Sequence, residues 1–231
     1  MGSAPVILAI FALSLASFYI AFVLVMRSVR IRRAKAEELA IAARLTYVDG
    51  EAALRSSYEE AGALASWEML MKLPAFIRAF LAASAPWRLE GERDGARVEA
   101  FEETRSSGKN SKTVIVVRAL YPKPLPFKLR AGREGTLAKI GKALFGLADV
   151  EVGDGAFDGA VRVAADDKDV ARALFSRQEA RTALLALLAR FPEATAVSGW
   201  VERERTGRMP DAAELEEVLD LLVAAAKAIG T

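Results

Sequence analysis

The chain contains 231 residues with 32 cationic and 30 anionic side chains, and it has neither cysteine nor histidine. These two absences exclude cysteine nucleophiles, Ser-His-Asp triads, imidazole bases, disulfides and Cys/His zinc sites. Carboxylate pairs, Ser-Lys dyads, phosphate-binding loops and carboxylate-bound Mg²⁺ or Ca²⁺ remain.

The first predicted element is a membrane-spanning helix over residues 1–26, because residues 4–26 carry no charged side chain. A helix of that length spans about 34 Å, and the hydrocarbon core of a bilayer is about 30 Å thick. A cleavable signal peptide is the competing interpretation. It would need a positive start, a shorter apolar core and a small-residue cleavage site, and this segment has none of them.

A basic cluster follows the uncharged run at once, at Arg27, Arg30, Arg32, Arg33 and Lys35. The more positive flank of a span stays in the cytoplasm. We therefore expect a single-pass protein of the cell (inner) membrane, with its N-terminus outside, its C-terminal domain cytoplasmic and the lipid bilayer as its first partner. Residues 27–48 are rich in good helix formers and are predicted to form a basic juxtamembrane stalk.

Ala12 and Ala16 have the spacing of small residues that lets two membrane helices approach closely. This spacing predicts a homo-oligomer through the membrane helix. The alternative is that alanine is simply common in this chain.

Residues 49–86 are predicted to be helical, beginning after a break at Asp49-Gly50. The apolar stretch 64–85 is interrupted at Pro74, which is expected to divide it into two helices. Three interpretations of this stretch stay open: a core helix, a helix lying on the membrane surface, and a second span.

From residue 87 to 231 the pattern predicts an α+β domain in which an antiparallel sheet packs with helices. Alternating residues on both sides of Asp94-Gly95 indicate a hairpin. Further strands are expected at 113–120, 127–131, 160–165 and 194–205. Helices are expected at 136–144, 168–175 and 178–191, and in a last segment that begins after Asp211 and ends near Ile229.

Several local patterns suggest ligand chemistry but are better explained as turns and caps. Gly153-Asp154-Gly155 lacks the helix that a dinucleotide fingerprint opens, and Ser107-Gly108-Lys109 lacks the upstream glycine of a phosphate-binding loop. Asp166 and Asp169 are predicted to cap a helix. With Asp154, Asp158 and Asp167 they form the densest carboxylate group, whose spacing is not that of a calcium loop. No catalytic residue, cofactor or metal is predicted.

The middle of the chain is strongly basic, with ten cations and one anion between residues 105 and 142. We expect this segment to contact anionic lipid head groups or an acidic protein partner. The alternative is a solvated face balanced by the acidic C-terminal part. Nucleic acid is not expected, because the cations are not interleaved with exposed aromatic residues. The predicted contact residues are Lys109, Lys112, Lys123, Lys128, Arg130, Arg133, Lys139 and Lys142.

Residues 149–205 carry a pattern in which an acidic stretch precedes Phe157-Asp158, a strand ends at Val163, and a helix contains Ala171-Arg172. This pattern resembles one found in uncharacterised bacterial membrane-anchored proteins. The resemblance implies a membrane topology and a domain of unknown function, and it contributes no catalytic residue.

Together these features predict a membrane-tethered cytoplasmic binding or scaffolding module. The alternative is a carboxylate- or metal-dependent hydrolase or transferase anchored to the inner membrane. A deep pocket that gathers two or more carboxylates would favour the enzyme, whereas a shallow basic surface would favour the module.

Overall fold

The computed structural model describes residues 3–60, 62–107, 110–140 and 146–231. The chain forms two compact units, one made of Met1–Glu38 and Val48–Trp87 and the other of Leu39–Tyr47 and Arg88–Thr231. They are called unit 1 and unit 2 below, and each is described by itself.

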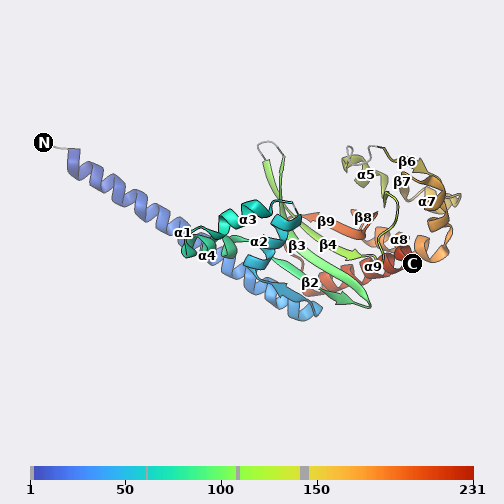
Figure 1. Cartoon of the computed structure of the whole chain (residues 1–231), viewed down its shortest axis with the longest axis horizontal. Coiled ribbons are helices and arrows are strands. Elements are labelled where there is room, and N and C mark those ends of the chain that lie inside the picture. Colours follow the sequence, from blue (N-terminus) through green and yellow to red (C-terminus); the bar gives the residue numbers. More distant parts are fainter. Residues whose placement is uncertain (1–2, 61, 108–109, 141–145) are drawn as a thin grey trace. The chain divides into compact units, whose positions relative to one another are not determined.

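Helix α1 (Ser3–Ala43) is one continuous helix of 41 residues (Figure 1). It carries the basic cluster without a break, so the helix predicted over residues 27–48 is confirmed as far as Ala43, whereas residues 46–48 form a strand instead. The side chains at positions 13, 14, 16, 17 and 19–25 are exposed, with Leu13 at 71% and Tyr19 at 67%. None of the helices in the described part of the chain combines the length and the apolar character that a membrane span requires. The span expected over residues 1–26 is thus unsupported by the structure and stays a prediction.

The rest of unit 1 contains α2 (Gly50–Glu60), α3 (Leu64–Met71) and α4 (Ala75–Ser84). Pro74 lies at the N-cap of α4, with φ −51° and ψ 142°, so its predicted division of the apolar stretch is confirmed. Helix α2 packs against both α3 and α4. The rings of Tyr58 and Trp67 meet at a centroid distance of 6.1 Å.

A nine-stranded sheet runs in the order β1-β2-β3-β4-β9-β8-β5-β7-β6, and strands β2 to β9 lie in unit 2. The pairings described between β2 and β9 are all antiparallel, so the predicted α+β class is confirmed. The strands are β1 (Thr46–Val48), β2 (Arg88–Arg93), β3 (Ala96–Ser107), β4 (Asn110–Leu120), β5 (Leu129–Gly132), β6 (Ala148–Val150), β7 (Arg162–Ala165), β8 (Ala194–Val197) and β9 (Trp200–Thr206).

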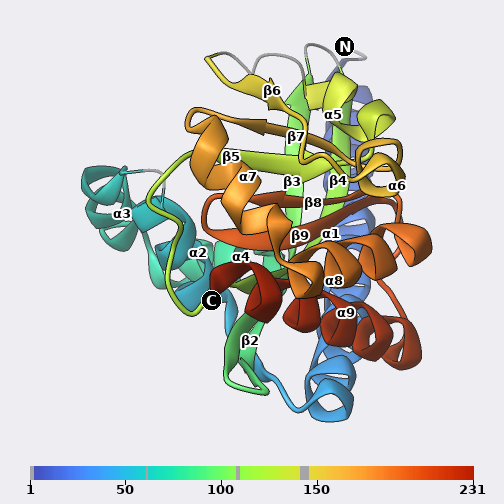
Figure 2. The same cartoon turned by 90° about the vertical axis from the view of Figure 1, so that its right-hand side faces the viewer.

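The helices of unit 2 are α5 (Glu134–Ile140), α6 (Gly155–Asp158), α7 (Lys168–Ser176), α8 (Gln178–Arg190) and α9 (Ala212–Gly230). Helix α9 packs on α8 and on strands β3, β4 and β9, in front of the sheet in Figure 2. Its buried face includes Leu215, Leu219 and Leu222, each fully buried. Burial of a leucine side chain contributes about 1.5–3 kcal/mol to the stability of the folded state, so these leucines are a substantial part of the core of unit 2.

Most local signals in unit 2 act as predicted, with two corrections. Asp94 and Gly95 both adopt positive φ, at 49° and 78°, and close the β2–β3 hairpin. Asp211 accepts a hydrogen bond from the backbone N–H of Glu214 and caps α9. The N-cap of α7 is Asp167, however, and not Asp166. The segment 194–205 is a hairpin of two strands and not a single strand.

Candidate functional site: a polar groove on the sheet

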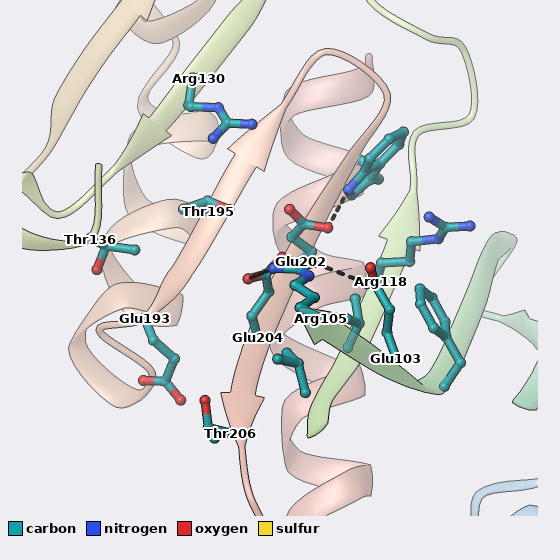
Figure 3. Close-up of a pocket in the computed structure, with 14 residues that line it drawn as sticks. Glu103, Arg105, Arg118, Arg130, Thr136, Glu193, Thr195, Glu202, Glu204 and Thr206 are labelled. Atoms are coloured by element: carbon teal, nitrogen blue, oxygen red, sulfur yellow. Dashed lines mark hydrogen bonds and ion pairs between the residues drawn. The ribbon is translucent and has the colours of Figure 1, made fainter. Parts of the chain in front are cut away.

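One hollow of unit 2 is a groove of about 610 Å³ on one face of the sheet, and it gathers charged and aromatic side chains from several strands (Figure 3). Its lining comes from strands β3, β4, β5, β8 and β9, with Thr136 of α5 and Glu193 just before β8. The volume falls within the range of about 300–1,000 Å³ typical of small-molecule sites.

Strand alternation explains why these residues share the groove. Along β9, Trp200, Glu202, Glu204 and Thr206 line the groove. Between them stands Arg203, which pairs with Glu214 of α9 at 2.9 Å and so points to the opposite face. Because successive side chains of a strand point to opposite faces, the helix-covered core and the groove are the two sides of one sheet.

One end of the groove is closed by an ion-pair network centred on Arg105. Both terminal nitrogens of Arg105 donate to Glu204 at 2.7 Å, and Nη2 also donates to Glu103 at 3.1 Å. These charge-assisted hydrogen bonds raise the pKa of the Arg105 guanidinium above its usual range. Glu204 and Glu103 are therefore both paired with Arg105.

Arg118 is held between two aromatic rings. Its guanidinium carbon lies 5.0 Å from the ring centroid of Phe101 and 5.1 Å from that of Trp200. The same guanidinium donates from Nε to Glu99 at 2.7 Å. This arrangement fixes Arg118 as part of the wall of the groove, with its charge compensated by a buried carboxylate.

Glu202 lies on the floor of the groove and accepts a hydrogen bond of 2.6 Å from Trp200 Nε1. Burial raises the pKa of its carboxyl group above the ordinary value of 4.5, and this outweighs the hydrogen bond from Trp200. Glu204 adds to the rise in pKa by repulsion, while Arg118 and Arg130 act against it. A buried carboxyl with a raised pKa in a concave site is a common mark of function.

Arg130 enters the groove from β5 and is half-buried. Its side chain makes no hydrogen bond or ion pair with any residue that the structure describes, and Figure 3 shows its guanidinium standing apart from the dashed contacts. Thr195, on the adjacent strand β8, lines the same part of the groove and is 4% exposed.

Of the predicted anionic-surface residues whose side chains the structure describes, Arg130 is the one that lines this groove. Four others are exposed: Lys112 on β4, Lys123 and Lys128 in the connection between β4 and β5, and Arg133 just after β5. Lys109 and Lys142, and the side chain of Lys139, lie outside the described part of the chain, so the predicted contact surface stays a prediction.

The predicted anchor residues lie along α1. The four arginines of the basic cluster are exposed and Lys35 is half-buried, with Arg33 paired to Glu37 at 2.8 Å. Ala16 is exposed, and the side chain of Ala12 lies outside the described part. The predicted self-association through these two alanines is therefore still a prediction.

The aspartates of the dense carboxylate group have local structural roles. Asp154 caps α6 and pairs with Arg181 at 3.1 Å, and Asp158 accepts hydrogen bonds from two backbone N–H groups. Asp166 accepts from the backbone N–H of Lys128 at 2.8 Å. Over the ranges that the structure describes, no set of three or more acidic side chains is arranged to hold a metal ion.

Sequence reasoning missed Trp200 and Glu202 as site residues. The signal was present as a charged residue at every second position of a strand that also carries tryptophan. It was not sufficient, because the partners Arg118 and Arg130 come from strands that lie 70 or more positions earlier in the chain.

Comparison with known proteins leaves the family of the chain open. No family model and no curated protein matches the sequence. Among solved structures, the chain is similar to the crystal structure of the mycobacterial trehalose monomycolate transport factor A, TtfA. The two share 10% sequence identity at a TM-score of 0.46, over 84% of this chain and 92% of that one. These values are too low to transfer a function.

Proposed function

We propose that this protein is a membrane-tethered binding module. The start of α1 is embedded in lipid, and the groove of unit 2 is the surface that binds a ligand on the cytoplasmic side of the inner membrane. Among the described residues no helix has both the length and the apolar character of a span, so the support for the tether comes from the sequence and from exposed side chains.

The main support for the tether is that apolar side chains are exposed on all sides of the first part of α1. Tyr19, Ile20, Phe22 and Val25 are 42–67% exposed. At 100° per residue these positions point in different directions around the helix axis. A helix that is apolar on all sides needs an apolar surrounding on all sides, which a lipid bilayer supplies.

The basic cluster supports the orientation. Its four arginines are exposed on the turns that follow the apolar part of α1. Positive side chains next to an embedded helix favour the cytoplasmic side. The start of α1 would then lie outside and unit 2 inside.

The groove supports a binding role because it combines concavity with convergent polar groups. Arg130, Glu202 and Thr195 approach one space from three strands, and Phe101 and Trp200 supply apolar walls. Small-molecule sites typically have this mixture of aromatic walls and a few placed polar groups.

The tether is tested by placing charges within the apolar part of α1 in the full chain. Leu13→Arg combined with Ile20→Arg should release the protein from membranes washed with alkaline carbonate, because each arginine costs about 2.5–3.5 kcal/mol near the middle of a bilayer. The matched control is Ile31→Arg with Ile41→Arg, at exposed positions of the same helix that are 61% and 81% exposed.

We expect the control to stay in the membrane fraction. Equal extraction of both double variants, or extraction of the unaltered chain, would contradict the proposed tether.

A second candidate is the hydrolase or transferase, which is favoured by Glu202. A carboxyl with a raised pKa in a groove suits a general acid. Of the other groove carboxylates, Glu204 and Glu103 are paired with Arg105, and Glu193 with Arg203 at 2.5 Å. Turnover of ester or phosphoester substrates that Glu202→Gln abolishes would establish the enzyme, and a lack of turnover would leave the binding module.

A further inference from the structure

We propose that the groove binds a small organic ligand through a negatively charged oxygen group, a carboxylate or a phosphate, which Arg130 receives. This inference rests on the proposed role of the groove as a binding surface and names the chemistry of its ligand.

The first argument is the charge balance among the groove cations. Arg105 is paired with Glu204 and Glu103, and Arg118 is paired with the buried Glu99. Arg130 has no such partner among the described residues. A guanidinium stays protonated at every physiological pH, so Arg130 brings to its end of the groove a positive charge that no ion pair with a described residue neutralises.

Glu202 is the carboxylate that faces Arg130, and it compensates this charge only in part. Its carboxylate attracts Arg130 without forming an ion pair in the described structure, and one of its oxygens accepts the Trp200 indole N–H. The terminal N–H groups of Arg130 are therefore available to a ligand, and a guanidinium fork matches a carboxylate or phosphate in geometry.

Thr195 adds a second donor beside Arg130. Arg130 is paired across the strands with Val197, so Thr195 is its diagonal neighbour on the same face. Diagonal neighbours lie about 7–8 Å apart, within the reach of an arginine side chain. Figure 3 shows both side chains on the same side of the groove. The buried hydroxyl of Thr195 donates to the bound oxygen group.

The remaining walls of the groove indicate the chemical character of the rest of the ligand. Val116 is 2% exposed at the base of the groove, and the rings of Phe101 and Trp200 flank Arg118. An apolar or ring-shaped body attached to the anionic group would pack on these walls, because the polar groups beside it are already paired. The ligand class is thus a small acid or phosphate ester with an apolar body.

The test uses the full chain in neutral detergent micelles and measures its thermal unfolding midpoint. Sodium benzoate and inorganic phosphate are compared with sodium chloride at equal ionic strength. A ligand that binds only the folded state raises the midpoint in proportion to its affinity, and the two probes separate a carboxylate ligand from a phosphate ligand.

We expect at least one of the two anions to stabilise the unaltered chain. Arg130→Gln should weaken the binding of that anion by about tenfold or more, because the charge-assisted hydrogen bonds are lost. Arg133→Gln is the matched control, since Arg133 is an exposed cation three positions further along that does not line the groove. The Arg133→Gln variant should bind the anion as tightly as the unaltered chain does.

The same response in Arg130→Gln and the unaltered chain, or no response to either anion beyond that to chloride, would overturn the inference. Arg130→Lys is a second variant in case Arg130→Gln does not fold, because lysine keeps the positive charge and lacks only the guanidinium fork. It should show intermediate affinity, and unaltered affinity would refute the fork contact. Carbonate extraction of the same variants reports the tether separately, so a failure of the anion site is distinguishable from a failure of the proposed tether.

Discussion

Glu99 is a buried carboxylate whose partners come from three strands of unit 2. Its side chain is 2% exposed and lies 3.2 Å from Arg88, 3.0 Å from Arg97 and 2.5 Å from Arg118. Burying a charge is costly unless other charges and hydrogen bonds satisfy it, and three guanidinium groups do so here. The cluster ties β2, β3 and β4 together on the groove face of the sheet.

Replacing Glu99 with alanine should therefore destabilise the protein strongly. The change leaves the nearly buried Arg88 and Arg118 without their shared counter-charge, which typically costs about 3–5 kcal/mol. Glu92→Ala on the exposed edge of β2 is the control and should change stability by less than about 0.5 kcal/mol. Urea unfolding measures both variants, and similar unfolding midpoints for the two would refute the proposed role of the cluster.

Glu202 predicts a pH dependence of stability. Its pKa is raised in the folded protein, so the folded state binds more protons than the unfolded state between 4.5 and the raised value. The stabilising contribution is fully present below the unfolded pKa and is lost as pH rises through the folded pKa. Trp200, Glu204, Arg118 and Arg130 face the carboxyl and set the size of this effect.

Glu202→Gln imitates the neutral carboxyl and should remove this dependence. The variant should gain stability relative to the unaltered chain as the pH is raised from 4.5 to 7.5. Urea unfolding at the two pH values measures the difference. A constant difference between the two proteins across this range would contradict the assignment.

At the scale of the element, two separate features define the start of α2. Asp49 Oδ1 accepts hydrogen bonds from the backbone N–H groups of Glu51 and Ala52, at 2.9 and 3.0 Å, and so begins α2. Gly50 has a different role, because a Cβ atom at this position would lie 1.8 Å from the carbonyl oxygen of Ala82 in α4. The missing side chain lets α2 and α4 approach backbone to backbone.

Gly50→Ala should therefore separate α2 from α4, although alanine favours helices more than glycine does. We expect a loss of about 1–3 kcal/mol from overpacking, and faster hydrogen exchange in residues 50–84. Gly135→Ala in α5 is the control, because open space surrounds that position, and it should be neutral or stabilising. Unchanged exchange in Gly50→Ala would show that the two helices tolerate a wider spacing.

At the scale of the whole molecule, the separation of charge along the chain suggests how unit 2 meets a membrane. Lys112, Lys123, Lys128 and Arg133 are exposed cations, whereas α9 exposes acidic side chains such as Glu216. An anionic leaflet attracts each nearby cation by about 1 kcal/mol and repels acidic groups. The parts of unit 2 around these cations should then lie nearer to anionic lipid than α9 does.

This orientation is testable because the chain has no native cysteine. In full-length protein in nanodiscs, a polarity-sensitive dye on Ser111→Cys should shift to the blue with anionic lipid and not with neutral lipid. The shift should weaken in 0.5 M salt, since screening shortens the reach of exposed charges. A dye on Glu216→Cys is the control, and an equal shift at both positions would refute the orientation.

Much of the local structure follows from the sequence alone, and the reasons are local. Pro74 cannot continue a helix, Asp94-Gly95 accepts positive φ, and the Asp211 side chain satisfies a free N–H group. The helix cap at Asp167 was assigned one residue early, because adjacent aspartates offer equivalent oxygens. Helix α6 was missed, since four residues are too few to show a period.

The candidate site was predictable only in part. Arg130 was identified as basic, but its position in a groove depends on β5 lying beside β8, and these strands are more than 60 residues apart in the chain. Glu202 and Trp200 were not singled out, because a single strand does not reveal which of its faces a helix covers.

The sequence by itself determined the uncharged run followed by cations, the α+β class and the chemistries that a chain without cysteine or histidine lacks. These depend on composition and on neighbours a few residues apart. Only the tertiary structure decided that Glu99 is buried among three arginines, and that Arg130 faces Glu202 without an ion pair to any described residue. Such relations arise from the pairing of distant strands, because the sheet order brings together side chains that no local pattern connects.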